Sequence, residues 1–494
     1  MSYELKTITP EQAGIPSSVI SEFIDKLAEK KIVLHSLLMV KDGNLLTEAY
    51  WKPIDGNFRH RMYSTSKSFV SVAIGILIGE GKLSLDDKAI GFFPDKVPED
   101  VSPLLAMTTI RDLLKMSTPY SYGCTYSPQD PDWADTFFRA KTSHHPGMIF
   151  NYDTTATTML CMIIKRVAGE DFTDYLRPRL FKPLGMTEDI KCVKTPCGYE
   201  WGGSGVLCTS RDLAKFATIC LNMGKHEDQQ LIPEWYMKEA TSKQIDNRST
   251  ENHVEICQGY GYQFWCLRNN GFATLGMGCQ VSLNLPEYGF SMVTTGDTQS
   301  LPGGYEAYLF PLFWDTIYPY LQKKEKLSEN KAEYDALQNK ISSLSVPTVD
   351  GELTSPVAEM VNGREYKLNE NPMNISRVKF TFEGNEGVMY YTNKTGDHEI
   401  RFGFGHQVNG TFPETHYFGD YIGKPSGKGY DIITSAAWGM EDSLFIYCYA
   451  IDKYFGKIKM NIVFRENRIS ILMQKVAEWF FDEYNGFACG EMAE

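Results

Sequence analysis

The chain has 494 residues, of which 43% are hydrophobic and 22% charged, a composition typical of a globular protein with about two to four domains, and this excludes disorder as its main state. Lysine and arginine number 49 and aspartate and glutamate 62, so the formal net charge is −13. A chain this acidic repels phosphate backbones, and we therefore expect no nucleic-acid partner.

Eleven cysteines are scattered along the chain without a C-x-x-C pair, and the closest two are Cys192 and Cys197. We interpret them as reduced core residues, not as a disulfide framework or a zinc site. The first residues lack a basic start followed by an apolar run, and the longest apolar stretch, 69–78, is too short to cross a bilayer. The sequence therefore predicts a cytoplasmic protein without a membrane contact.

The first elements along the chain are a helix, a hairpin and a second helix. Residues 16–30 repeat their apolar positions with a helical period. Two apolar runs, 35–40 and 45–51, flank a KDGN turn and predict a β-hairpin. The centre of 62–81 is apolar on every side, which predicts a helix buried inside the protein.

The middle of the chain is helical, and strands return after it. Strands that occur early and late, with helices between them, predict an α/β (α+β) domain whose antiparallel sheet is built from both ends and covered by helices. The further helices are expected near 109–116, 154–168, 210–223 and 306–321, and the later strands between 259 and 296.

A change in composition marks a domain boundary. Residues 323–350 are charged with a helical period and end in a Pro/Gly/Ser break, which predicts a solvated connecting helix. From 351 to 494 the apolar positions alternate between turn residues, which indicates an antiparallel β domain, either a small barrel or a curved sheet. The first domain would then comprise residues 1–322.

The motif S-x-x-K occurs three times, and its surroundings distinguish the three copies. Ser328 falls in the charged linker, where a solvated lysine is the natural interpretation. Ser376 falls in an alternating strand, where residues three apart face opposite sides. Ser64 opens the apolar helix, and residues three apart on a helix are neighbours, so the amine of Lys67 can reach its hydroxyl.

The Ser64 copy is the one that could carry chemistry. Burial disfavours the ammonium form of lysine, and a neutral amine beside a serine can take its proton and activate it as a nucleophile. Free N–H groups at the start of a helix can also stabilise an oxyanion. The alternative is that Ser64 caps the helix and Lys67 extends to the surface. H-E-x-x-H, G-x-x-x-x-G-K-[ST] and G-x-S-x-G are all absent.

Five blocks follow one another between about residues 10 and 320: MYSTSKSFVSVAIGILIGEG, TIRDLLKMST, HHPGMIFNYDTTATTML…PLGM, GGSGVLCTSRDLAKF, and GYGYQFW followed by TLGMGCQ. In this order they resemble the serine β-lactamase and penicillin-binding-protein superfamily, specifically its class-C-like branch of esterases, D-aminopeptidases and 6-aminohexanoate-dimer hydrolases. The order of the five blocks is more specific than any single block.

The resemblance implies a role for each matched residue. Ser64 would be the nucleophile and Lys67 the activating amine. Tyr152 would transfer a proton to the leaving group, which requires nearby cations to lower its pKa. The oxyanion would be held by the backbone N–H groups of Ser64 and Gln280. No cofactor and no metal are implied.

Two positions depart from the pattern of that branch. The asparagine of its Y-x-N motif is Thr154, whose hydroxyl can replace one hydrogen bond of the amide but not both. The K-T-G or H-x-G motif aligns with Met277-Gly278-Cys279, and methionine cannot bind a substrate carboxylate as a cation does. The departures argue against β-lactamase or DD-peptidase activity. The C-terminal β domain resembles the lipocalin-like domains of some members of that branch, and this resemblance is one of fold alone.

These inferences lead to one main hypothesis and two alternatives. The main hypothesis is a serine hydrolase that forms an acyl-enzyme on Ser64 from a small-molecule or short-peptide substrate, with an esterase favoured over an amidase or peptidase because Met277 is neutral. The alternatives are a non-catalytic binding protein on the same fold and a weak β-lactamase. A homo-oligomer is compatible with the sequence. Four roles are possible for the β domain: it could cover the cleft, mediate dimerisation, bind an apolar ligand or act as a stabilising appendage.

Substrate specificity is expected to come from the loops between 118 and 146 and between 225 and 258. Three tryptophans are candidates to line the pocket, although the interpretation we prefer for each is an ordinary core residue: Trp133, Trp201 and Trp265.

Overall fold

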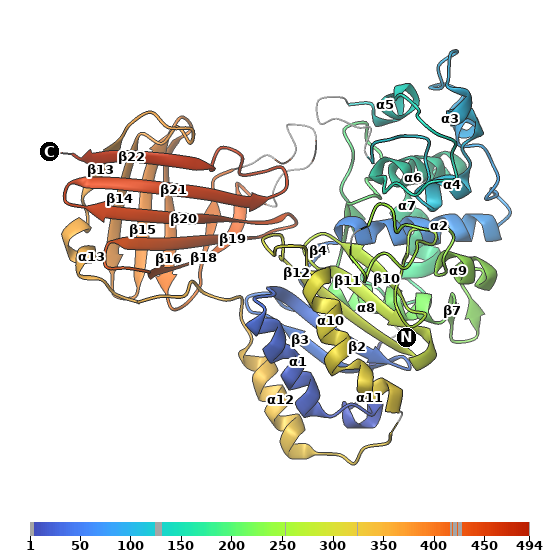
Figure 1. Cartoon of the computed structure of the whole chain (residues 1–494), viewed down its shortest axis with the longest axis horizontal. Coiled ribbons are helices and arrows are strands. Elements are labelled where there is room, and N and C mark those ends of the chain that lie inside the picture. The colour runs from blue at the N-terminus through green and yellow to red at the C-terminus, as the bar shows by residue number, and fades with distance from the viewer. Residues whose placement is uncertain are drawn as a thin grey trace. The chain divides into compact units, whose positions relative to one another are not determined.

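The computed structural model divides the chain into two compact units, residues 1–346 and 347–494 (Figure 1). Within the residues that it describes, no helix is long and apolar enough to cross a membrane. The described residues are 4–123, 131–251, 253–323, 325–414, 417, 422 and 427–493.

A seven-stranded sheet organises the first unit, with strand order β1-β3-β2-β12-β11-β10-β9. The early hairpin β2–β3 joins the late strands through antiparallel pairing of β2 with β12, and β1 pairs parallel with β3. A sheet built from both ends of the domain is thus confirmed. The strands are β1 (Lys6–Thr7), β2 (Leu34–Lys41), β3 (Asn44–Tyr50), β9 (Trp265–Cys266), β10 (Phe272–Gly276), β11 (Gln280–Leu285) and β12 (Phe290–Gly296).

Helices cover both faces of this sheet (Figure 1), and the side chains of β12 alternate between these two faces. On one face Phe290 stacks on Phe313 of α10 (Glu306–Thr316), with ring centroids 5.7 Å apart. On the other, Thr295 and Ser36 share a hydrogen bond of 2.7 Å, and Ser36 bonds Ser210 at the start of α8. Further helices of these layers are α1 (Ser17–Glu29), α8 (Ser210–Leu221) and α11 (Tyr318–Lys323).

The buried helix α2 (Ser66–Gly79) anchors the helical region beside the sheet. All but its last two residues are buried, as its apolar sequence predicts. Phe69 stacks on Phe216 of α8 with ring centroids 3.8 Å apart, and Gly75 lies against the ring of Tyr236. The other elements here are α3 (Pro103–Met107), α4 (Ile110–Leu114), α5 (Trp133–Arg139), α6 (Thr154–Ala168), α7 (Phe172–Leu176), α9 (Glu234–Ala240), β4 (His60–Arg61), β5 (Lys191–Cys192), β6 (Val206–Cys208), β7 (Lys225–His226) and β8 (Gln229–Gln230).

The charged helix expected between the domains, α12 (Lys331–Ser343), belongs to the first unit. It packs on α1, where the Lys340 amine pairs with the Asp25 carboxylate at 2.5 Å and the Ser18 N–H donates to Glu333. Its buried Leu337 gives it one apolar contact face. The division between the units therefore lies at 346/347, and residues 323–350 do not form a free connecting helix.

The second unit is the expected antiparallel β domain, closed into a barrel. Nine strands run in the order β16-β15-β14-β13-β22-β21-β20-β19-β18, and a parallel pairing of β18 with β16 closes the ring. The first half of β18 pairs instead with β17. The elements are α13 (Pro356–Val361), β13 (Glu365–Leu368), β14 (Arg377–Glu383), β15 (Glu386–Asn393), β16 (Gly396–Phe404), β17 (Val408–Phe412), β18 (Tyr430–Trp438), β19 (Ser443–Ile451), β20 (Phe455–Arg465), β21 (Arg468–Ala477) and β22 (Gly486–Met492).

Candidate active site

Ser64 lies in a tight turn that leads into the buried helix. The turn, Tyr63–Thr65, is a 3-10 helix, and α2 begins only at Ser66, two residues later than expected. Tyr63 has φ 46°, a left-handed conformation that is costly for a bulky residue and is typical of functional turns. Strand β4 and this turn therefore present the half-buried Ser64 at the start of α2.

Lys67 is buried directly beneath Ser64. Its side chain is 1% exposed, and its Nζ donates to the Ser64 Oγ at 2.9 Å and to the Gly203 carbonyl at 2.6 Å. The alternative in which Lys67 extends to the surface is therefore wrong. The side chain of Thr65, the residue at the cap position of α2, makes no capping bond.

Tyr152 converges on the same lysine from another segment. The Lys67 Nζ lies 5.0 Å from the centroid of the Tyr152 ring. Trp265 stacks on that ring at 5.5 Å with an interplanar angle of 28°, and Tyr260 meets it edge-on at 6.4 Å. The structure thus brings Ser64, Lys67 and Tyr152 together, and two aromatic side chains hold the orientation of the tyrosine.

The residue after Tyr152 fixes the start of helix α6. Asp153 accepts hydrogen bonds from the Thr155 N–H at 2.8 Å and the Thr118 hydroxyl at 2.9 Å. Burial raises the pKa of its carboxyl to about 6. This cap holds the segment that carries Tyr152 at one angle to α6.

Thr154 is the first residue of α6 and packs against the loop that binds Lys67. Its N–H donates to the Gly123 carbonyl at 3.0 Å. A β-carbon on Gly203 would lie 2.7 Å from the Thr154 methyl group. Thr154 therefore contacts the residue whose carbonyl holds Lys67, and its hydrogen bond to substrate stays a prediction.

The β10–β11 hairpin reaches the turn of Ser64. A β-carbon on Gly276 would overlap the Met62 carbonyl, and the Thr65 hydroxyl donates to the Gln280 carbonyl at 2.7 Å. The Gln280 side-chain amide is fully buried and bonds the Met277 and Gly296 carbonyls at 3.0 and 2.8 Å. Gln280 thus braces the hairpin with its side chain, and the oxyanion role of its backbone N–H stays a prediction.

The tip of this hairpin is the segment that departs from the expected motif. Gly278 and Cys279 have φ values of 81° and 82°, so the chain reverses in two left-handed residues. Cys279 and Gly278 are buried, whereas Met277 is half-buried and is the partly exposed residue of the turn. The partly exposed residue of this turn is therefore a methionine, and its alignment with the cation or imidazole of the family motif stays a prediction.

Trp265 contacts a predicted catalytic side chain, because its ring stacks on that of Tyr152. Trp133 and Trp201 are fully buried, 5.4 Å apart in an edge-to-face pair, and the guanidinium of Arg61 lies 4.8 Å from the Trp201 ring. These two are core residues.

Sequence reasoning missed the residues that support the lysine and tyrosine. The block GGSGVLC contains Gly203, but no motif indicates that its carbonyl binds Lys67. Gln263 has φ 64° and joins two helices, because its amide bonds the Leu114 carbonyl at 2.8 Å and the Thr157 hydroxyl at 2.5 Å. The segment 259–267, expected to be a strand, is therefore mostly an irregular clamp that ends in the two-residue β9.

A buried carboxyl precedes the Gly203 loop. Glu200 is 6% exposed and accepts hydrogen bonds from the Thr173 N–H and hydroxyl at 2.9 and 2.5 Å. Burial raises its pKa to about 7. The folded state therefore favours the protonated carboxyl of Glu200. Its contribution to the free energy of unfolding is fully present below the ordinary pKa of glutamate and is lost as the pH rises through 7.

We expect Glu200→Gln to be more stable than the parent protein at pH 8 by about 2 kcal/mol, because glutamine keeps the shape and carries no charge. At pH 5 the difference should nearly vanish. Urea unfolding at both pH values measures this, with Glu99→Gln, an exposed carboxylate, as the control. Equal stabilisation at both pH values would show that the effect does not come from ionisation.

Two pockets do not have Ser64 among their lining residues. One, of about 660 Å³, is formed by 120–122 and 135–143 in the first specificity loop. The rest of that loop, 124–130, and Asn252 in the second loop lie outside the described residues. Within the described residues, no group of three or more His, Cys, Asp or Glu side chains could hold a metal.

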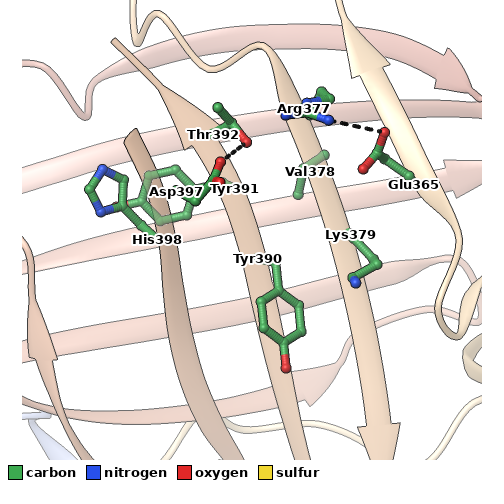
Figure 2. A pocket seen from close by; sticks show the side chains of 9 residues that line it. All are labelled: Glu365, Arg377, Val378, Lys379, Tyr390, Tyr391, Thr392, Asp397 and His398. Atoms are coloured by element: carbon green, nitrogen blue, oxygen red, sulfur yellow. Dashed lines mark hydrogen bonds and ion pairs between the residues drawn. The ribbon is translucent and has the colours of Figure 1, made fainter. Parts of the chain in front are cut away.

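The other pocket, of about 250 Å³, lies on strands β13–β16 of the barrel (Figure 2). Figure 2 shows Arg377 paired with Glu365 at 3.8 Å and Thr392 bonded to Asp397 at 2.6 Å. The Lys379 Nζ lies 4.8 Å from the centroid of the Tyr390 ring. Its polar lining does not favour an apolar ligand.

The sheet, the buried helix and the lysine beneath the serine define the fold of the serine β-lactamases and penicillin-binding proteins. A sequence profile described as Beta-lactamase matches residues 20–310, more than half of the chain. The chain belongs to this family, which confirms the resemblance found in the sequence.

Several characterised proteins are similar to this chain. 6-Aminohexanoate-dimer hydrolase of Paenarthrobacter ureafaciens is 23% identical over 265 residues, which cover 49% of this chain and 67% of the hydrolase. The mitochondrial serine beta-lactamase-like protein LACTB of Bos taurus is 28% identical over 129 residues, 20% of this chain and 23% of that protein. The solved structure of EstCE1, a hydrolase with promiscuous acyltransferase activity, has a TM-score of 0.50 at 17% identity and covers 62% of this chain and 99% of its own.

Proposed function

We propose that this protein is a serine hydrolase that cleaves an ester or an amide through an acyl-enzyme on Ser64. The observation that carries the proposal is the 2.9 Å contact between the Lys67 Nζ and the Ser64 Oγ, with the Lys67 Nζ 5.0 Å from the centroid of the Tyr152 ring. Membership of a hydrolase family supports the reaction class.

In the first step the Ser64 oxygen attacks the substrate carbonyl carbon, and its proton passes to the Lys67 amine. The bond to the leaving group then breaks, and Tyr152 delivers a proton to that group. In the second step water attacks the carbonyl carbon of the acyl-enzyme and gives a proton to the Tyr152 oxygen. The Lys67 ammonium returns its proton to the Ser64 oxygen as the acyl bond breaks, which releases the acid and restores all three residues. The oxyanion would be held by backbone N–H groups of the Ser64 turn and the β10–β11 hairpin, which lie in contact.

An esterase is favoured over an amidase, and a β-lactamase is disfavoured. Met277 offers no cation for a substrate carboxylate, and Thr154 offers one hydroxyl in place of an amide. Both changes weaken the binding of β-lactams and of D-Ala-D-Ala peptides. Nitrocefin turnover is expected to be slow or absent.

The test is covalent labelling of the full chain with a fluorophosphonate, together with hydrolysis of a short-chain p-nitrophenyl ester. We expect the label on the peptide that contains Ser64 and its loss in Ser64→Ala. Ser376→Ala, which removes the serine of another S-x-x-K motif, is the matched control and should label normally. Absence of labelling and of turnover would refute the proposal.

A non-catalytic binding protein on the same fold is the second candidate, favoured by the exchange of the Y-x-N asparagine for Thr154. This candidate predicts that Ser64→Ala keeps ligand binding and that no acyl adduct forms. Mass spectrometry of the intact protein after incubation with the ester separates the two, because only the enzyme gains the mass of the acyl group.

A further inference from the structure

A buried arginine lies behind the turn of Ser64. Arg61, the last residue of β4, is 0% exposed, and a guanidinium cannot be deprotonated in a protein. A buried charge is costly unless the surrounding groups pair with it, so the contacts of this arginine indicate its role. They reach both the residue before Ser64 and the turn that binds Lys67.

On the side of Ser64, the guanidinium carbon of Arg61 lies 4.4 Å from the centroid of the Tyr63 ring. Tyr63 has a left-handed φ of 46°, a conformation that persists only where the surroundings hold it. Trp201 presents a second ring to the same guanidinium at 4.8 Å, and contacts between a cation and an aromatic face are attractive. Arg61 therefore helps to hold the strained residue that precedes Ser64.

On the side of Lys67, Arg61 binds the turn that contains Gly203. Its Nε donates to the Ser204 carbonyl at 2.9 Å and its Nη2 to the Ser204 Oγ at 2.8 Å. The Ser204 N–H donates to the Trp201 carbonyl at 3.0 Å, so the residue whose ring contacts the guanidinium also closes the turn. The Gly203 carbonyl, one residue before Ser204, accepts from the Lys67 Nζ at 2.6 Å.

A backbone bond fixes the other end of this turn. The Met62 N–H donates to the Val206 carbonyl at 2.8 Å. The end that contains Gly203 is bound by the side chains of Arg61 and Lys67. A loss of the Arg61 contacts would therefore let the Gly203 carbonyl move relative to Lys67, while the pairing at the other end stays.

The two basic side chains also act on each other through their charge. They bind consecutive residues, Gly203 and Ser204, and a like charge nearby disfavours the charged form of an ionisable group. Arg61 cannot lose its proton, so the group that becomes neutral is the Lys67 amine. A neutral amine is the form that takes the proton of Ser64 in the proposed reaction.

Further titratable groups face this turn and Lys67 from the neighbouring segments: the thiols of Cys161 and Cys192, the carboxyls of Asp153 and Glu200, and the phenol of Tyr152. Burial raises the pKa of both thiols well above the usual value, so neither carries a charge at neutral pH. Burial also raises the pKa of Asp153 to about 6 and that of Glu200 to about 7. Glu200 is the carboxyl of the two that titrates closer to neutral pH, and the experiment separates it from Lys67.

We propose that Arg61 is a positioning residue that holds the Gly203 carbonyl against Lys67 and, by its permanent charge, keeps the Lys67 amine unprotonated. Arg61 acts on the reaction through this lysine, because a fully buried side chain does not reach the substrate. The inference rests on the proposed function, since it concerns the amine that activates Ser64.

The experiment measures the rate of fluorophosphonate labelling of Ser64 against pH in the full-length protein. Arg61→Met keeps the length of the side chain and removes its charge and donors, whereas Arg61→Lys keeps the charge and loses the planar fork. Both substitutions are compared in the parent protein and in Lys67→Met. Arg179→Met is the matched control, because the Arg179 guanidinium also lies over an aromatic ring, that of Tyr175, at 4.0 Å.

At pH 7 we expect Arg61→Met to slow labelling by about 10²-fold, the typical cost of a misplaced catalytic group. The acid limb of its pH profile should move up by about one pH unit, because the like charge that favours the neutral amine is gone. In Lys67→Met the loss should be at least about tenfold smaller, since no amine remains to be positioned. Arg61→Lys should slow labelling and leave the acid limb in place, and Arg179→Met should label at the parent rate.

The same shift of the acid limb should appear in Glu200→Gln, in which that carboxyl cannot titrate, and its absence there would overturn the role of the charge. Equal losses in the parent protein and in Lys67→Met would contradict the positioning role, because a merely structural arginine acts independently of the amine. If Arg61→Met does not fold, Arg61→Lys in both backgrounds gives the same comparison of losses. Failure of the proposed function has a different signature, because the parent protein itself would then take no label on Ser64.

Discussion

Replacing Lys67 by methionine is expected to lower the rate at which esters acylate Ser64 by about 10³-fold, within the range of general-base catalysis. The amine lies 2.9 Å from the Ser64 Oγ, and methionine has a similar length without a proton acceptor. The substitution also removes the 2.6 Å hydrogen bond to the Gly203 carbonyl, and we expect the backbone at Gly203 to stay in position. Stopped-flow release of p-nitrophenol from a p-nitrophenyl ester measures the acylation step.

Lys379→Met is the matched control, since Lys379 ends another S-x-x-K motif and lies half-exposed on strand β14. It should acylate at the parent rate. A loss below about fivefold in Lys67→Met would contradict the role of the amine, because general-base catalysis contributes about a hundredfold or more. Fluorophosphonate labelling should slow in parallel, because it uses the same activated oxygen.

The elements with clear periodicity were predictable from the sequence. The hairpin β2–β3 follows from two apolar runs around a turn-forming pair, and helix α2 from a run of apolar residues that no surface helix would carry. The β domain follows from alternation, whereas its closure depends on the pairing of Gly403 and Phe404 with β18, between segments with no local signal. The all-antiparallel expectation therefore missed one parallel pairing.

Two errors arose where tertiary contacts override local patterns. The alternating apolar residues of 259–267 predict a strand. Gln263 instead adopts a left-handed backbone conformation, and its side-chain amide forms hydrogen bonds to helices α4 and α6. The charge of α12 predicts a solvated linker, and most of the helix is exposed, but it also packs on α1, with Leu337 buried and Lys340 paired with Asp25.

The residues of the candidate site likewise fall into those that local sequence predicts and those that only tertiary contacts bring together. Ser64 and Lys67 are three residues apart, so their contact follows from helix geometry once the helix is recognised. Gly203, which binds Lys67, and Trp265, which stacks on Tyr152, each come from a segment more than a hundred residues from its partner, and no motif predicts either contact. The sequence of the Met277–Gln280 turn could be aligned with the family motif, but its position relative to Ser64 could not be predicted. That position depends on the packing of Gly276 against Met62, which no local pattern indicates.

That packing gives the last prediction. Gly276→Ala is expected to lower kcat/KM by about 10²-fold, the typical cost of a displacement of about 1 Å in an active site. The added β-carbon would overlap the Met62 carbonyl, which is backbone and cannot rotate away. Either the Ser64 turn or the hairpin must therefore move, and the 2.7 Å bond from the Thr65 hydroxyl to the Gln280 carbonyl is strained with it.

Gly91→Ala is the control, because no atom lies within 4 Å of the β-carbon it would add. Thermal unfolding of both variants separates loss of the site from loss of the fold, since a local displacement lowers kcat/KM while the protein still unfolds cooperatively. If Gly276→Ala kept full activity and an unchanged Tm, the hairpin would not contribute to the position of Ser64. A strong loss in Gly276→Ala alone would instead support an oxyanion site shared by the turn and the hairpin, since only this substitution changes the distance between their backbones.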